Sequence, residues 1–252
     1  MIIPDTQCKP NADFQHLSFA GQYAVDKKPD VIVFIGDHWD MPSLSSYDVG
    51  KKSFEGRRYI DDIQAGQLAM ATFLAPLELH NIRAREQKKK LYLPRLVFCL
   101  GNHEERINKA VESDRKLEGL ISTDDLELDV FGFEVVPFLQ PIVIDGVCYS
   151  HYFSSGILGR PVSSARALLT KKHMSCIMGH VQDRAIDYQK RADGKNITGI
   201  FAGIFYPHKE TYLTPQTDQS WAGVWMLHDV KDGEFDEMPV SLSYLRRRYG
   251  SL

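Results

Sequence analysis

The chain has 252 residues, of which 43% are hydrophobic and 25% are charged, which is the composition of an ordinary globular protein with a sizeable core. The net charge of −3 excludes a global positive field that attracts nucleic acid, so such binding would need local patches or bound cations. No apolar run approaches the roughly 20 residues that span a bilayer, and the N-terminus lacks the pattern of a signal peptide, so we predict a cytoplasmic protein without a membrane partner.

The first half of the chain alternates between strand and helix patterns. Buried parallel strands are predicted from continuous apolar runs, and helices are predicted from apolar residues at a spacing of three or four. The segment 41–60 is polar and rich in turn residues, so we expect a loop or insert there. The predicted strands are 1–4, 30–35 and 96–100, and the predicted helices are 13–27, 60–90 (one helix or two) and 104–117.

From about residue 130 the pattern becomes rich in short strands. Runs at 133–138, 141–146, 147–153 and 175–179 are typical of strands, and a helix is expected over 162–173. Two hairpins are predicted, around Asp193-Gly194 and around Asp232-Gly233, because Asp-Gly favours a tight turn between strands. We expect one domain over residues 1–252, an α/β fold with two stacked mixed sheets flanked by helices in a four-layer α-β-β-α sandwich.

The four cysteines show neither metal-site nor disulfide-framework spacing. Cys99, Cys148 and Cys176 lie in apolar strand-like runs, and Cys8 follows one. We interpret all four as buried core residues in a reducing compartment.

Polar clusters follow five of the predicted strands. They occupy residues 5–7 (DTQ), 36–40 (GDHWD), 101–104 (GNHE), His151 and residues 179–182 (GHVQ). Because ligand sites in open α/β sheets gather at the carboxyl ends of strands, we expect these side chains to converge on one point.

This order of motifs resembles the calcineurin-like metallophosphoesterases over residues 3–182. Their usual pattern is DxH, GDxxx, GNH followed by Asp or Glu, then H and GHxH. The resemblance implies the four-layer fold and a pair of divalent metal ions that activate water for attack on a phosphoester. The implied metal ligands are Asp5, Gln7, Asp37, Asn102, His151, His180 and Gln182, with Asp37 between the two ions and Asn102 also holding the phosphoryl oxygens.

The resemblance also implies roles for two residues that do not bind metal. His103 would act as a general acid at the scissile ester or stabilise charge on the phosphoryl oxygens. Asp40 would orient His103, although a turn or helix cap is the alternative for this residue.

Two positions depart from the family pattern. Gln7 and Gln182 stand where the family usually has histidines. Both would bind the first of the two ions together with Asp5, and we call this the first metal site. The second ion would be completed by Asn102, His151 and His180. The resemblance implies two divalent ions. Because amide oxygen suits Mn²⁺ or Mg²⁺ better than Zn²⁺ or iron, we predict that Mn²⁺ is favoured, with Mg²⁺ as the alternative. The first site is then either the weaker of the two or empty until a substrate phosphate completes it.

Several residues are candidates for substrate binding. Arg160 and Arg184 lie close in sequence to His151 and Gln182, and each could contact a substrate phosphate. Trp39 could either stack on a base or pack in the core. His208 matches no ligand position and is interpreted as structural. The basic residues near the C-terminus, 245–249 (LRRRY), could contact nucleic acid or simply be a solvated terminus.

Three functions remain open at this point. Met41-Pro42 interrupts the GDxxDRG pattern of the protein phosphatases, which argues against a Ser/Thr protein phosphatase. We favour a phosphodiesterase or nuclease that acts on nucleotides or DNA. The alternatives are a phosphomonoesterase and, from another class, a catalytically silent metal-binding scaffold.

Overall fold

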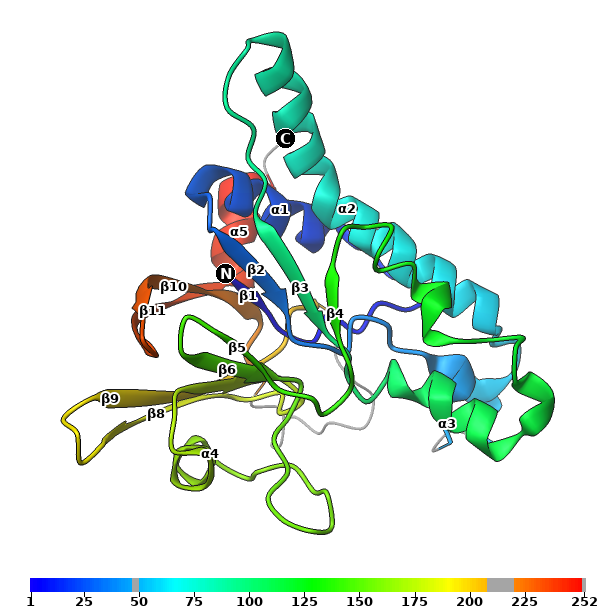
Figure 1. Ribbon diagram of the computed structural model, residues 1–252. Coiled ribbons are helices and arrows are strands. Elements are labelled where there is room, and N and C mark those ends of the chain that lie inside the picture. Colours follow the sequence, from blue (N-terminus) through cyan, green and yellow to red (C-terminus); the bar gives the residue numbers. More distant parts are fainter. Residues whose placement is uncertain (47–49, 208–219, 251–252) are drawn as a thin grey trace.

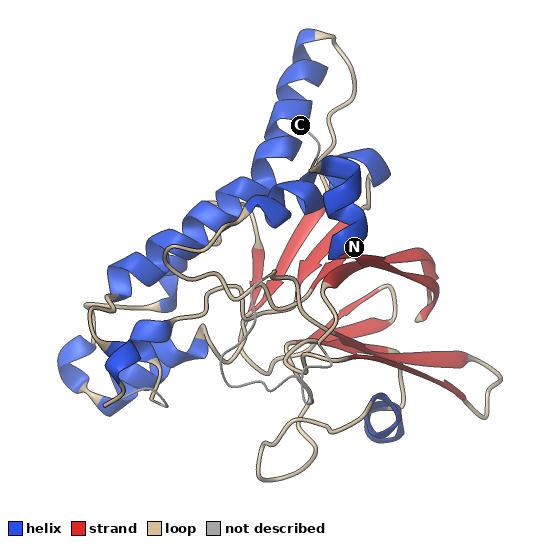
Figure 2. Ribbon diagram, turned by 180° about the vertical axis from the view of Figure 1, so that it is seen from behind, coloured by secondary structure: helices blue, strands red, loops and turns tan. Residues whose placement is uncertain are grey.

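The protein is described by a computed structural model that covers residues 1–46, 50–207 and 220–250. Two mixed sheets stack face to face and helices cover their outer faces, so the chain forms an α/β sandwich, as the sequence predicts (Figure 1). Figure 2 shows the same layers from the opposite side, with helices along the outer side of the larger sheet.

The larger sheet has six strands in the order β11-β10-β1-β2-β3-β4. Strands β1, β2, β3 and β4 run parallel to one another, whereas β10 pairs antiparallel with both β1 and β11. The strands are β1 (Ile2–Ile3), β2 (Val31–Phe34), β3 (Arg95–Cys99), β4 (Glu134–Val136), β10 (Gly223–Lys231) and β11 (Glu234–Ser241).

The smaller sheet has five strands in the order β5-β6-β7-β9-β8. Strands β6, β7 and β9 are parallel, and β5 and β8 pair antiparallel at the two edges. The strands are β5 (Ile142–Ile144), β6 (Val147–Ser150), β7 (Cys176–Met178), β8 (Arg184–Lys190) and β9 (Asn196–Ala202).

Five α-helices lie in the described part of the chain. Helices α1, α2 and α5 pack on the larger sheet, and α4 packs on the smaller one (Figure 1). Helix α3 lies beside the carboxyl end of β3, where it borders the candidate site described below. The helices are α1 (Gln15–Lys27), α2 (Tyr59–Glu86), α3 (Glu105–Ser113), α4 (Ala165–Lys172) and α5 (Leu242–Tyr249).

Alternation along the strands explains the layers. In β2, Ile32 and Phe34 point to the core beneath the helices, whereas Val33 packs in the core between the two sheets. Successive side chains of a strand face opposite sides, so a strand with apolar residues at every position must be covered on both faces. A third core lies between the smaller sheet and α4 and includes Leu168 and Phe201.

Most predicted elements are present, and two of the predicted helices differ at their bounds. Residues 60–90 form one helix that ends at Glu86, although Pro76 lies within it. The predicted helix over 104–117 ends at Ser113, and residues 115–117 form a separate 3-10 turn that Asp114 caps through the N–H of Lys116. Both predicted hairpins are confirmed as β8–β9 and β10–β11.

The sequence interpretation missed the last helix. Residues 242–245 read as the end of a hairpin, but Ser241 accepts the N–H of Tyr244 and α5 begins at Leu242. Its buried Leu245 packs in the core beneath the helices, and the Tyr249 hydroxyl donates to Asp26 at 2.7 Å. The basic terminal segment is therefore one face of a packed helix.

The segment 41–60 contains two 3-10 turns, η1 (Pro42–Leu44) and η2 (Lys52–Phe54), before α2 begins. The four cysteines are buried and free, as the sequence predicts. In the described part of the chain, no helix combines the length and apolar character needed to cross a bilayer. His208 lies outside the described residues.

Candidate metal centre

The polar segments that follow the strands meet at one edge of the two sheets. The Asp37 carbonyl accepts the N–H of Gln7 at 2.9 Å, and the Asp37 carboxylate accepts the N–H of His103 at 2.9 Å. Across the gap between the sheets, the Asp5 carboxylate accepts the N–H of His180 at 3.0 Å. Residues from four distant segments are therefore joined by hydrogen bonds before any ligand is considered.

Four side chains from these segments form a compact group, which we call the ligand cluster: Asp37, Asn102, His151 and His180. Asn102 Oδ1 lies 2.9 Å from His151 Nε2 and 2.7 Å from His180 Nδ1. Asp37 Oδ2 lies 3.3 Å from His151 Nε2. One ligand atom each from Asp37, His151 and His180 lies within 4.8 Å of the others, a spacing that suits a single metal ion.

The tautomer of His151 is fixed by a backbone contact. His151 Nδ1 lies 2.9 Å from the carbonyl oxygen of Ile35, which can only accept, so Nδ1 carries the proton. Nε2 then presents its lone pair to two further acceptors, Asn102 Oδ1 and Asp37 Oδ2. Three acceptors that face one another in a buried site need a cation between them, either a proton or a metal ion.

The pKa values of the cluster reflect this crowding. Burial lowers the pKa of His151, but the charge of Asp37 outweighs it and raises the pKa to about 9. Burial acts to raise the pKa of Asp37, yet the charges of His103 and His151 hold it well below its usual range. Burial lowers the pKa of His180 to about 4, so this side chain is neutral at pH 7 and able to act as a ligand.

The backbone at the site adopts conformations that only a supporting structure maintains. Asp37 has φ 51° and His180 has φ 64°, both in the left-handed region that non-glycine residues rarely occupy. Gly101 permits the close approach of two turns, because a Cβ at this position would lie 2.2 Å from Asp37 Oδ1 and 2.3 Å from Asp37 N. The GD and GN pairs of the sequence therefore have a steric reason as well as a chemical one.

Glu104 is the buried support for these turns. Its carboxylate accepts three backbone N–H groups, from Asp37 at 3.0 Å, from Trp39 at 2.9 Å and from Gly101 at 2.7 Å. It thereby joins the turn after β2 to the turn after β3. Sequence reasoning assigned Glu104 no role; the signal was its place directly after the Gly-Asn-His triplet.

His103 lies beside the ligand cluster and contacts two charged residues. Its Nδ1 is 3.1 Å from Asp40 Oδ1, and its Nε2 is 2.9 Å from Arg106 Nη2. Burial lowers the pKa of His103, but Asp37 and Asp40 outweigh it and raise the pKa above its usual value. Asp40 is therefore placed to hold the His103 ring in one orientation, and the part of this pair in proton transfer stays a prediction.

Arg106 was not among the residues that the sequence analysis singled out. Its guanidinium donates to the Asp40 carbonyl at 2.6 Å and to the Met41 carbonyl at 3.2 Å, in addition to its contact with His103. These bonds hold the start of the 41–60 segment against α3. Arg106 is the second residue of α3 and lies two residues after the end of the GNHE segment, and this position was the available sequence signal.

Of the three residues expected at the first metal site, Asp5 and Gln7 are hydrogen-bonded to residues of the ligand cluster, whereas the backbone of Gln182 bonds outside the cluster. Asp5 is buried next to His180, and burial, opposed by the charge of His151, raises its pKa to about 7. Gln7 is buried with φ 38° beside Asp37. Gln182 is half-buried two residues beyond His180, and its carbonyl accepts the N–H of Trp221 at 3.2 Å.

The residues expected to bind substrate are placed differently from one another. Asn102 belongs to the ligand cluster and borders the adjoining cleft. Arg160 is exposed, and its carbonyl accepts the N–H of Ser155 in the loop before α4. The Arg184 guanidinium stacks on the ring of Trp221 with 5.0 Å between them. Neither arginine has a recorded contact with the cluster within the described residues, so their role stays a prediction.

Trp39 is a core residue. It is fully buried, and its indole N–H donates to the carbonyl of Ile63 at 3.2 Å. The alternative that it stacks on a base is therefore wrong, because the turn after β2 buries both His38 and Trp39 in the interior.

The donor atoms present fit a divalent cation. A carboxylate, an amide oxygen and two imidazoles are ligands that Mn²⁺, Fe²⁺ and Zn²⁺ accept, whereas the Asp5, Gln7 and Gln182 side chains offer oxygen donors, which suit Mn²⁺ or Mg²⁺.

Comparison of the sequence with models of known protein families gave no match, and comparison with curated proteins gave none either.

Proposed function

We propose that the protein is a metal-dependent phosphoester hydrolase of the calcineurin-like metallophosphoesterase kind, and specifically a phosphodiesterase or nuclease. The observation that carries the proposal is the convergence of acceptor atoms in the ligand cluster. Asn102 Oδ1 lies within 3 Å of two imidazole nitrogens, and the proton of His151 is directed away from the cluster to Ile35. When the His151 ring is charged, its second proton lies on Nε2 and satisfies the facing acceptors, and a metal ion bound here would take the place of that proton.

The chemistry divides between the cations and the chain. Bound divalent ions would lower the pKa of an attacking water and neutralise charge on the phosphoryl oxygens. Asn102 orients the phosphoryl group through its amide. His103 supplies a proton to the leaving oxygen from Nε2 once the substrate displaces the Arg106 guanidinium, which donates to that nitrogen in this structure. Asp40 holds the His103 ring by its contact with Nδ1 and, with Asp37, favours the protonated ring.

The His103–Asp40 pair favours an enzyme over a silent scaffold. His103 contacts Asp37 Oδ2 only at 3.7 Å and therefore stands beside the ligand cluster and not within it. A protein that only stores metal has no need for an imidazole with a raised pKa next to its ligands.

A panel of substrates tests the proposal. Purified protein would be treated with a chelator, reloaded with Mn²⁺, Mg²⁺ or Zn²⁺ in turn, and assayed on bis-p-nitrophenyl phosphate, p-nitrophenyl phosphate and single-stranded DNA. Hydrolysis of the diester or the DNA supports a phosphodiesterase, and hydrolysis of the monoester alone supports a phosphomonoesterase. Silence with every metal, while the protein still binds Mn²⁺ by calorimetry, supports the scaffold.

We also propose that the protein works in the cytoplasm. All four cysteines are free and buried, which suits a reducing compartment.

A further inference from the structure

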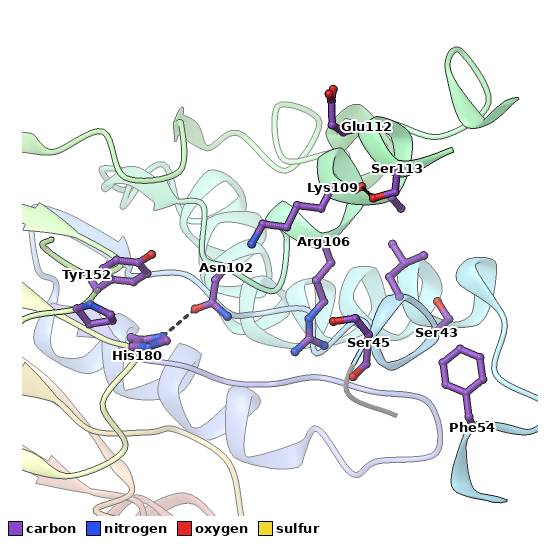
Figure 3. Close-up of a pocket in the computed structure, with 14 residues that line it drawn as sticks. Ser43, Ser45, Phe54, Asn102, Arg106, Lys109, Glu112, Ser113, Tyr152 and His180 are labelled. Carbon is purple, nitrogen blue, oxygen red and sulfur yellow. Dashed lines mark hydrogen bonds between the residues drawn. The ribbon is translucent and has the colours of Figure 1, made fainter. Parts of the chain in front are cut away.

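A cleft opens from the ligand cluster and runs along α3. It begins at Asn102 and His180, and one wall is the face of α3 that carries Arg106 and Lys109 (Figure 3). The opposite wall consists of the η1 segment and Phe54. We call it the α3 cleft.

We propose that the α3 cleft binds the part of a nucleotide or oligonucleotide that lies beyond the scissile phosphate, with Lys109 holding a second phosphate. This inference rests on the proposed function of the ligand cluster, and it names the substrate class that the cluster serves.

The size of the cleft exceeds what a small monoester needs. Its volume is about 720 Å³. Cavities of several hundred Å³ hold molecules of the size of a nucleotide or larger, whereas a lone phosphate bound at the cluster would leave most of this space to water. The volume therefore favours a substrate that continues past the reacting phosphate.

The charge in the cleft is placed for an anion. Lys109 follows Arg106 by three residues, so both lie on one face of α3, about 4.5 Å apart along its axis. Helical side chains lean toward the N-terminus of their helix, and Figure 3 shows Lys109 reaching back along the cleft toward Asn102. Glu112 also borders the cleft but points away from Asn102 in the same view.

Lys109 is the cation that remains for a ligand. The Arg106 guanidinium already donates to two backbone carbonyls and contacts His103. Within the described residues, the structure records no ion pair or hydrogen bond for the Lys109 ammonium, and the only recorded contact of this residue is its carbonyl, which accepts the Ser113 hydroxyl. An ammonium beside a phosphoester site is well suited to a second phosphate.

Aromatic rings border the cleft at both ends. The Tyr152 ring lies 4.9 Å from the His180 ring at the inner end, and Phe54 lies at the outer end (Figure 3). Such rings provide faces on which a base or sugar can pack, and this favours a nucleotide over a purely inorganic polyphosphate. Ser43 and Ser45 add hydroxyl groups along the same wall.

A binding measurement tests the proposal independently of catalysis. The probe is a fluorescein-labelled phosphorothioate oligothymidylate, which resists hydrolysis, and its anisotropy is followed at several salt concentrations. Lys109→Gln should weaken binding about fivefold and lower the slope of log K against log salt by about 0.7, the loss of one phosphate contact on a single strand. Lys116→Gln is the matched control, because Lys116 is exposed on the neighbouring 3-10 turn outside the cleft lining.

Equal affinities for the two variants, or no binding by the wild type, would overturn the cleft assignment. Hydrolysis of bis-p-nitrophenyl phosphate, measured on the same preparations, reports on the ligand cluster alone because this ester has no second phosphate. If that hydrolysis persists while Lys109 has no effect on binding, the cleft proposal fails and the proposed function stands. If Lys109 governs binding and no substrate is hydrolysed, the proposed function fails and the anion subsite stands.

Discussion

Replacement of Glu104 by glutamine tests whether a buried carboxylate holds the candidate metal centre together. Glu104 Oε2 accepts the N–H groups of Asp37 and Gly101, and Oε1 accepts that of Trp39. Glutamine retains one oxygen, so its best orientation keeps two of these bonds and turns an NH₂ group toward the third N–H. A lost charge-assisted bond is worth about 1.5–3 kcal/mol, and the two remaining bonds become weaker neutral ones.

We therefore expect Glu104→Gln to lower the free energy of unfolding by about 3 kcal/mol, which corresponds to a fall in Tm of roughly 6–12 °C for a chain of this size. Burial and the charge of Asp37 raise the pKa of Glu104, whereas the N–H groups of Trp39 and Gly101 favour its ionised form. The substitution therefore removes a charge that these donors stabilise.

The assay is thermal unfolding with a chelator present, so that metal binding does not contribute, followed by Mn²⁺ calorimetry on the folded protein. Glu105→Gln is the control, because Glu105 is the next residue and, among the residues that the structure describes, its carboxylate accepts only the exposed Asn108 amide. Mn²⁺ affinity should also fall about 10–100-fold in the Glu104 variant, the usual effect of removing a group that supports metal ligands. Equal Tm values for the two variants would refute the structural role assigned to Glu104.

Three further predictions follow from the site and its surroundings. His103→Ala should leave Mn²⁺ binding nearly unchanged and reduce kcat about 10²–10⁴-fold on a substrate with a poor leaving group; a parallel loss of metal binding would make His103 a ligand. The double variant Gln7→His with Gln182→His should shift the metal preference toward Zn²⁺ in competition titrations, and an unchanged preference would mean that these residues do not bind metal. Burial raises the pKa of Asp62, which lies under the cleft wall and accepts the N–H of Ser43 at 2.8 Å. Because a raised carboxyl pKa stabilises the fold at low pH and loses that contribution as pH rises through the folded-state pKa, Asp62→Asn should raise Tm at pH 8 more than at pH 4, and an equal shift at both values would contradict the reasoning.

The sequence predicted the scaffold because its signals are local. Continuous apolar runs identified β2 and β3, which are buried on both faces, and Asp-Gly pairs identified the two hairpins. The helix α5 was missed because its start depends on a single capping serine after a long strand, and its residues 245–249 look like a solvated basic terminus.

The candidate site was predicted as a set of residues but not as a geometry. Each member of the ligand cluster follows a strand. The sequence predicts that these residues meet because parallel strands bring their carboxyl ends to one edge of a sheet. Within the GDHWD segment, however, the pattern could not decide which side chains face the site and which face the core.

Only the tertiary structure shows which residues support the candidate metal centre and where the α3 cleft lies. Glu104 meets Asp37 and Trp39 across more than 60 residues, and Arg106 meets the carbonyls of Asp40 and Met41 over a similar separation. Such contacts depend on where two turns lie in space. Every residue type here offers the same backbone N–H and C=O groups, so the sequence does not indicate which of them a buried side chain will contact. The sequence by itself therefore determined the strands and the ligand side chains at their ends, whereas the packing of α3 against the 41–60 segment determined how those side chains are held and which surface adjoins them.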